Sequence, residues 1–296
     1  MKYNIEILRL IAVVLITFTH TRNTLDSGVF VYIIEDLPQL GTLTLSIISG
    51  YLYWTSSKNR KSIFAKKVRT LAIPYLIANG VVIAANLIAY YGFGYNFLNR
   101  LSFDYSLITE GLFALNSAPV NPPTYFIRDI FIIFALIELV RNRNFYMLLI
   151  LVPYAVFGHL LLRYDILALF LTGAVIAHTE KYVKRFYPYI ISILLIISIF
   201  AILITDIYTY KYVVALLIFT VFFNLKLRFF NVGGFSYLLH LYHSPVIVTT
   251  FPLLALYVIN PYLSVILQIT VAIFACFVIY LLTRKFEKLK ILSGGR

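Results

Sequence analysis

Residues 187–205 read YPYIISILLIISIFAILIT and contain no charged side chain. An α-helix needs about twenty mainly apolar residues to cross the hydrocarbon core of a bilayer, and this run is nearly that long. The rest of the chain has the same character: of its 296 residues, 61% are hydrophobic and 12% are charged, and the mean hydropathy is +0.89. A soluble globular domain is roughly half apolar and a quarter charged. The composition therefore predicts an integral membrane protein.

Nine further stretches have a similar apolar character and are candidates for membrane spans. Together the ten candidates predict an all-α bundle of about ten transmembrane helices that forms a single domain over residues 1–296, with a short basic tail at 284–296. The predicted spans are 5–24, 38–55, 71–91, 124–140, 145–161, 165–179, 187–205, 211–225, 235–257 and 262–283. The longest connection, 92–123, contains a segment at 105–115 that is compatible with a short helix.

Lysine and arginine are distributed very unevenly between alternate connections. One side of the predicted bundle holds 19 of them and the other side holds 4. Cytoplasmic loops of membrane proteins carry an excess of these residues, so both termini are predicted to be cytoplasmic, and the net charge of +13 is mainly a topology signal rather than a nucleic-acid footprint. The basic side contains Lys2, Lys58, Arg60, Lys61, Lys66, Lys67, Arg69, Arg141, Arg143, Lys181, Lys184, Arg185, Lys226, Arg228, Arg284, Lys285, Lys288, Lys290 and Arg296.

Two features near the ends of the chain limit its class further. The single cysteine, Cys276, excludes an internal disulfide and a cysteine-based metal site, and no metal is expected. Glu6 and Arg9 interrupt the first apolar stretch, and no small-residue cleavage pattern follows it. The N-terminal stretch is therefore predicted to be a retained first span rather than a signal peptide.

The first predicted span carries two ionisable residues, Arg9 and His20. Such groups are costly within a membrane, so each is a functional candidate. On a continuous helix, eleven residues are about three turns, which places both side chains on one face and about 16 Å apart along the axis. This spacing suggests a long ligand held between a cation and an imidazole. The alternative is a structural arginine and a hydrogen-bonded core histidine.

Five segments in order along the chain resemble the acyltransferase 3 family of multi-span membrane acyltransferases, which includes bacterial glycan O-acetyltransferases. Three positions depart from the family pattern: Lys66 stands where two arginines are usual, Tyr125 replaces a tryptophan, and His240 stands where a tyrosine is common. A lysine supplies charge but no bidentate grip on phosphate. The five segments are Arg9 and His20 with ten residues between them, SIISGYL at 46–52, KKVR at 66–69 followed by IPY at 73–75, PTYFIRD at 123–129 and FSYLLHLYHSP at 235–245.

The resemblance implies a multi-pass protein of the bacterial inner or plasma membrane that uses acetyl-CoA or another acyl-CoA as donor. The implied acceptor is a hydroxyl of a cell-surface or lipid-linked saccharide. Membrane lipid is a further partner, nucleic acid is not, and a homo-oligomer stays open. The expected donor contacts are Arg9, Ser49, Gly50, Lys66, Lys67, Arg69, Tyr237 and His243. For Gly50, close helix packing is the competing explanation.

Three residues are the candidates for catalysis. His20 is expected to act as general base on the acceptor hydroxyl, because imidazole has the side-chain pKa nearest neutrality. Asp129 is expected to orient the His20 ring, as a carboxylate does in a triad, and Arg128 to stabilise an oxyanion or bind an acidic acceptor. The alternative is that Arg128 or Asp129 forms a structural ion pair with outer-side charges such as Glu35 or Asp36.

Two other classes of protein share some of these features. A transporter or flippase for a saccharide would need the same spans and some buried charges, but not the Arg9 and His20 pairing. A structural membrane scaffold would leave the intramembrane charges unexplained.

Overall fold

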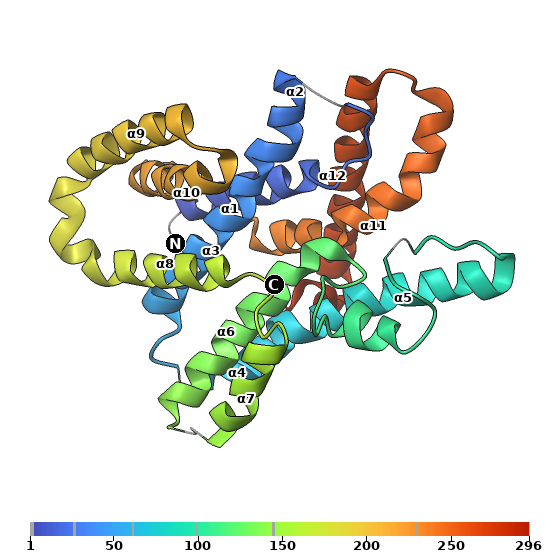
Figure 1. Ribbon diagram of the computed structural model, residues 1–296, viewed down its shortest axis with the longest axis horizontal. Coiled ribbons are helices and arrows are strands. Elements are labelled where there is room, and N and C mark those ends of the chain that lie inside the picture. The colour runs from blue at the N-terminus through green and yellow to red at the C-terminus, as the bar shows by residue number, and fades with distance from the viewer. Residues whose placement is uncertain are drawn as a thin grey trace. The chain divides into compact units, whose positions relative to one another are not determined.

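The computed structural model describes residues 3–25, 28–60, 62–98, 100–143, 146–225, 227–228 and 230–295. Within these ranges the chain is built of helices joined by short connections, and no β-strand occurs (Figure 1). The all-α class predicted from composition is confirmed. Lys2, Lys61, Lys226 and Arg296, which contribute to the predicted charge asymmetry, lie outside the described residues.

An α-helix occupies each of the ten predicted stretches. The helices are α1 (Tyr3–Phe18), α3 (Leu40–Ser56), α5 (Ile73–Phe93), α6 (Tyr125–Arg141), α7 (Tyr146–Phe157), α8 (Tyr164–Val183), α9 (Tyr187–Ile204), α10 (Ile207–Asn224), α11 (Gly233–Tyr257) and α12 (Pro261–Lys285). Short helical segments join them: α2 (Val29–Val31), α4 (Ile63–Lys67), η1 (Tyr32–Asp36), η2 (Leu37–Gln39), η3 (Val68–Ala72), η4 (Leu107–Leu112), η5 (Pro122–Thr124), η6 (Lys184–Phe186) and η7 (Glu287–Ser293).

Five continuous helical stretches in the described chain are long and apolar enough to cross a membrane. They are Ile63–Phe93, Tyr164–Ile204, Ile207–Asn224, Gly233–Tyr257 and Pro261–Lys285. The second of these contains both α8 and α9, which meet at the basic turn η6. These helices are those of a membrane protein, whereas the count of ten spans stays a prediction.

The end of α1 differs from the predicted span. The helix ends at Phe18 rather than near residue 24, and His20 lies in a turn in which its backbone N–H donates to the Thr17 carbonyl, 3.3 Å away. The hydroxyls of Thr19 and Thr21 bond to carbonyls three residues earlier, and such local bonds compete with the helical ladder. The expectation that Arg9 and His20 share the face of one continuous helix is therefore wrong.

The basic segment before α5 also differs from the prediction. The third predicted span starts at residue 71, but the chain is helical from Ile63, as α4 and the π-helical turn η3, and it continues into α5. Pro74 has no N–H, so it cannot bond to the carbonyl of Thr70 four residues earlier. A π-helical turn is one way to absorb such a break in the ladder.

The chain divides into two compact units. Unit 1 contains Met1–Arg60 and Asp165–Ala275, and unit 2 contains Lys61–Tyr164 and Cys276–Arg296. In unit 1, α1 packs against α3 and α11, while α10 packs against α3 and α9. In unit 2, α6 packs against α4 and η3, and η7 packs against η3 and α5.

Two glycines allow α3 and α8 of unit 1 to approach closely. A Cβ at Gly50 would overlap the carbonyl of Phe170, and a Cβ at Gly173 would overlap the carbonyl of Ile47. Because each glycine faces the backbone of the other helix, the two helices meet at a separation that no larger residue permits. Gly50 therefore has the packing role that sequence analysis gave as its competing explanation.

Candidate active site

Three histidines of unit 1 lie together where α1 ends against α11. The ring centroids of His20 and His243 are 5.2 Å apart with the ring planes tilted by 51°, and those of His240 and His243 are 6.4 Å apart. His243 is fully buried and His240 is 3% exposed, whereas His20 is half-buried. Among the described residues, no cluster of three or more histidine, cysteine or acidic side chains is arranged to hold a metal ion.

The hydrogen bond of His243 defines the state of its ring. Nδ1 lies 2.6 Å from the carbonyl oxygen of Leu239, one turn earlier in α11. A carbonyl only accepts, so Nδ1 carries the hydrogen, and in the neutral ring Nε2 is then an acceptor. This Nε2 is buried and has no hydrogen-bond partner within the described chain.

The other end of α1 holds the predicted donor contact Arg9. Its Nη1 donates to Oε1 of Glu6 at 2.9 Å, and the two side chains are 19% and 7% exposed. Glu6 was not predicted as this partner, although an acidic and a basic residue three positions apart on a helix are neighbours. Arg9 also borders the start of α11, since a Cβ at Gly233 would lie 3.0 Å from its Nη1.

These contacts show that α1 and α11 run parallel. Arg9 lies beside Gly233 at one end, and His20 lies beside His243 at the other. Ten residues of α-helix separate Gly233 from His243, which corresponds to about 15 Å along α11. The separation expected for a long ligand is therefore retained, although α11 rather than α1 spans it.

The other unit 1 candidates are buried or engaged in local bonds. Ser49 donates its hydroxyl to the Leu45 carbonyl at 2.8 Å. Tyr237 is buried within α11. Their predicted contact with an acyl donor stays a prediction.

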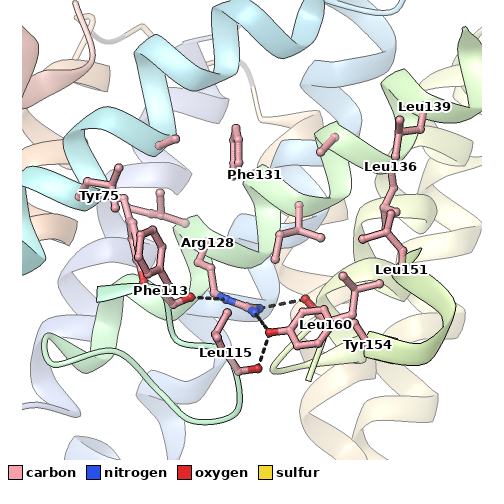
Figure 2. Close-up of a pocket in the computed structure, with 15 residues that line it drawn as sticks. Tyr75, Phe113, Leu115, Arg128, Phe131, Leu136, Leu139, Leu151, Tyr154 and Leu160 are labelled. Carbon is pink, nitrogen blue, oxygen red and sulfur yellow. Dashed lines mark hydrogen bonds between the residues drawn. The ribbon is translucent and has the colours of Figure 1, made fainter. Parts of the chain in front are cut away.

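In unit 2, Arg128 points from α6 into a network of oxygen atoms (Figure 2). A guanidinium has five N–H donors, and each has a partner here, so a bond to an oxyanion would require one of these bonds to break. Nε donates to the carbonyl of Phe113, Nη1 to Oδ1 of Asp129 and the carbonyl of Leu160, and Nη2 to the hydroxyl of Tyr154 and the carbonyl of His159.

Asp129 is fully buried and completes the same network. Its Oδ1 accepts from Nη1 of Arg128 at 2.7 Å, and its two oxygens accept the backbone N–H groups of Leu162 and Arg163. The structural ion pair considered from the sequence was with other outer-side charges, whereas the pair that forms joins the two neighbours themselves. It joins α6 to the connection before α8 and to the end of the outer loop. We call Arg128, Asp129 and Tyr154 the loop clamp.

The outer loop before α6 is folded around Glu110. This carboxylate accepts the backbone N–H groups of Asn116 and Ser117 at 2.9 and 2.8 Å, together with their side chains. Burial acts to raise the pKa of Glu110, but the hydrogen bonds from Asn116 and Ser117 outweigh it and hold the pKa below its usual value. The predicted short helix in this loop is present as η4.

A cavity of about 380 Å³ lies beside the loop clamp within unit 2 (Figure 2). Its wall is almost entirely hydrocarbon and aromatic, which suits an apolar group. It is lined by Ala72, Tyr75, Leu76, Phe113, Leu115, Ile127, Arg128, Phe131, Ile132, Ala135, Leu136, Leu139, Leu151, Tyr154 and Leu160.

The basic residues expected to contact the donor lie on α4 and η3 of unit 2. Lys66 and Arg69 are exposed. Lys67 is half-buried, and its ammonium lies 3.8 Å from the ring centroid of Phe134 on α6, within the range of a cation–π contact. These charges were predictable from the sequence, whereas the helix that carries them was not.

The sequence matches a family model described as an acyltransferase domain over residues 2–284, almost the whole chain. No curated protein gives a significant match, and no solved structure does either. The match covers all five segments on which the resemblance rests. The chain belongs to the acyltransferase 3 family.

Proposed function

We propose that this chain transfers an acyl group, with acetyl as the expected case, from cytosolic acyl-CoA to a hydroxyl of a cell-surface or lipid-linked saccharide. The observation that carries the proposal is the contact between half-buried His20 and His243, at one end of two parallel helices whose other end holds Arg9. A base and a cation about 15 Å apart suit a long donor with an anionic end and a reactive end. Membership of an acyltransferase family supports the reaction class.

In the proposed reaction, His20 takes the proton of the acceptor hydroxyl as its oxygen attacks the thioester carbonyl. The new ester C–O bond forms and the C–S bond of the donor breaks. The proton passes from His20 to the departing thiolate, so the products are the acylated saccharide and free coenzyme A. At the other end, the N–H groups of Arg9 that do not face Glu6 and the N-terminus of α11 can donate to the donor phosphates.

Mass spectrometry of surface glycans tests the proposed function directly. Glycans from a strain that carries the gene should contain an acyl mass that is absent from a deletion strain, and a plasmid copy should restore it. Identical glycan masses in the two strains would exclude the assignment. A change in the amount of exported glycan without any acyl mass would favour a transporter.

We further propose that the chain crosses a bacterial inner or plasma membrane ten times, with both termini in the cytoplasm. The uneven distribution of basic residues supports this topology. Single cysteines at residues 61 and 96 should react with an impermeant thiol reagent from opposite sides, with residue 61 labelled from the cytoplasm. A cysteine at residue 228 is the control and should label from the same side as residue 61. Labelling of residues 61 and 96 from one side would contradict the ten-span topology.

Lys66, Lys67 and Arg69 are proposed to contribute to donor binding through their charge. The double variant Lys67→Gln, Arg69→Gln should weaken the apparent affinity for acyl-CoA more than that for the acceptor, because a polyanion loses two nearby cations. Steady-state kinetics with each substrate varied in turn checks this. The matched control Lys58→Gln, Arg60→Gln removes the same charge and should leave the donor affinity unchanged. Equal donor affinity in wild type and the Lys67, Arg69 variant would mean that these residues do not bind the donor and serve only to set the membrane topology.

A further inference from the structure

His243 has a defined ring orientation that donor binding does not explain. Its Nδ1 is held by the Leu239 carbonyl, its ring lies against that of His20, and its Nε2 is buried without a partner in the described chain. A buried polar atom without a partner is destabilising, because it has lost its hydrogen bonds to water and gained none in return. This cost suggests that Nε2 of His243 accepts a hydrogen bond at some stage of the reaction.

The bond to Leu239 leaves a single acceptor atom on His243. With Nδ1 as the donor, the ε edge of the ring is not engaged by the backbone of its own helix. The His20 ring is the nearer of its two histidine neighbours, with the centroids 5.2 Å apart against 6.4 Å for His240. No side-chain hydrogen bond orders the His20 imidazole within the described chain, and its ring can therefore present either nitrogen to a substrate. An acceptor beside it would select one tautomer, as the buried carboxylate does in a catalytic triad.

We propose that His243 is a positioning residue for His20. In the substrate-bound enzyme, the His20 ring turns so that one of its N–H groups donates to Nε2 of His243, which has no partner within the described chain. The lone pair of the other His20 nitrogen is then left for the acceptor hydroxyl. The inference rests on the proposed function and deepens it, because it assigns to His243 the role of orienting His20 that was predicted for Asp129. His243 touches neither the donor nor the acceptor in this account.

The proton balance of the reaction is unchanged by this role. The hydroxyl proton moves to the free nitrogen of His20, the C–O bond forms, the C–S bond breaks, and the same proton leaves with the thiolate as coenzyme A. His243 keeps its own Nδ1 hydrogen on the Leu239 carbonyl throughout. Its contribution is a hydrogen bond that strengthens while His20 carries positive charge.

Two isosteric variants separate this role from packing. In His243→Asn the amide N–H replaces Nδ1 and keeps the bond to Leu239, but no atom replaces Nε2. In His243→Gln the amide oxygen can replace Nε2 as an acceptor. His178→Asn serves as the control, because His178 packs on Trp54 in the same unit and is no part of the histidine cluster.

The test uses the full-length protein in nanodiscs and follows release of coenzyme A thiol. His243→Asn should lower kcat about ten- to hundredfold, by analogy with the loss seen when the hydrogen-bond partner of a metal-bound imidazole is removed, with KM for the donor unchanged. His243→Gln should recover much of that loss, and His178→Asn should match wild type. The ¹⁵N shifts of the His20 ring should report one tautomer in wild type and a mixture in His243→Asn.

Wild-type kcat in His243→Asn, or a single unchanged His20 tautomer in that variant, would overturn the inference and leave the proposed function standing. A raised donor KM with unchanged kcat would return His243 to the donor site and also overturn it. Absence of acyl transfer by the wild-type chain would remove both the inference and the function on which it rests.

Discussion

His20→Ala is expected to lower the rate of acyl transfer by about a hundredfold to ten-thousandfold, the range that a positioned acid–base group contributes. The variant should still fold and insert, because His20 lies in a half-buried turn and its ring makes no hydrogen bond with the described part of the chain. The measurement is glycan acylation in a strain that expresses His20→Ala at wild-type protein levels. The loss should be visible in any assay that detects the wild-type activity.

Arg9→Ala is the companion variant at the other end of α1. It should also impair transfer, but through donor binding, so excess donor should restore part of the rate. The same excess should not rescue His20→Ala. Normal acylation in the His20 variant would end the assignment of the base, and His240 and His243 would then be the next candidates. A transporter would instead show altered export of an unmodified glycan.

Asp129→Asn is expected to lower the free energy of unfolding by about 3–5 kcal/mol, the usual cost of removing one partner from a buried ion pair. The substitution keeps the shape of the side chain but leaves the Arg128 guanidinium without its counter-charge. It also turns one acceptor into a donor that faces the backbone N–H of Leu162 or Arg163. Denaturant or thermal unfolding in detergent measures the change.

The control for this prediction is Glu287→Gln, which removes an exposed carboxylate that lies 3.9 Å from Lys290. Exposed ion pairs contribute about 0–1 kcal/mol, so this variant should unfold almost like wild type. If Asp129→Asn instead kept wild-type stability while acyl transfer was lost, Asp129 would act in the chemistry and the loop clamp would not be its main role.

Hydropathy located the helices because long apolar runs are typical of membrane-spanning helices, but it did not locate the ends of those helices. α1 ends early where threonine hydroxyls bond to nearby carbonyls. The third predicted span begins early, at Ile63, because the helix continues through a basic segment. Neither effect changes the apolar character of the stretch. Local hydrogen bonding and charge decide such boundaries, and both act over only a few residues.

Some residues of the candidate site could also be predicted from the hydropathy pattern. Arg9 and His20 stand out because ionisable residues are rare within apolar runs. The pairing of His20 with His243 depends on the register of two distant helices, which the sequence pattern leaves open, although two odd-numbered spans must run parallel. The partners of Arg128 are mainly backbone carbonyls, and every residue type carries one, so no pattern of side chains announces them.

The parallel pairing of α1 with α11 has a consequence for biosynthesis. About 220 residues separate His20 from His243, and a ribosome that adds about 5–20 residues per second needs roughly 10–45 s to make them. For that interval α1 must remain in the membrane without the helix that completes its site. The Glu6 and Arg9 pair forms within α1 itself, so the nascent helix can enter the bilayer with its charge already compensated. During translation, α1 can therefore be inserted with its charges paired before α11, the second helix of the proposed site, is made.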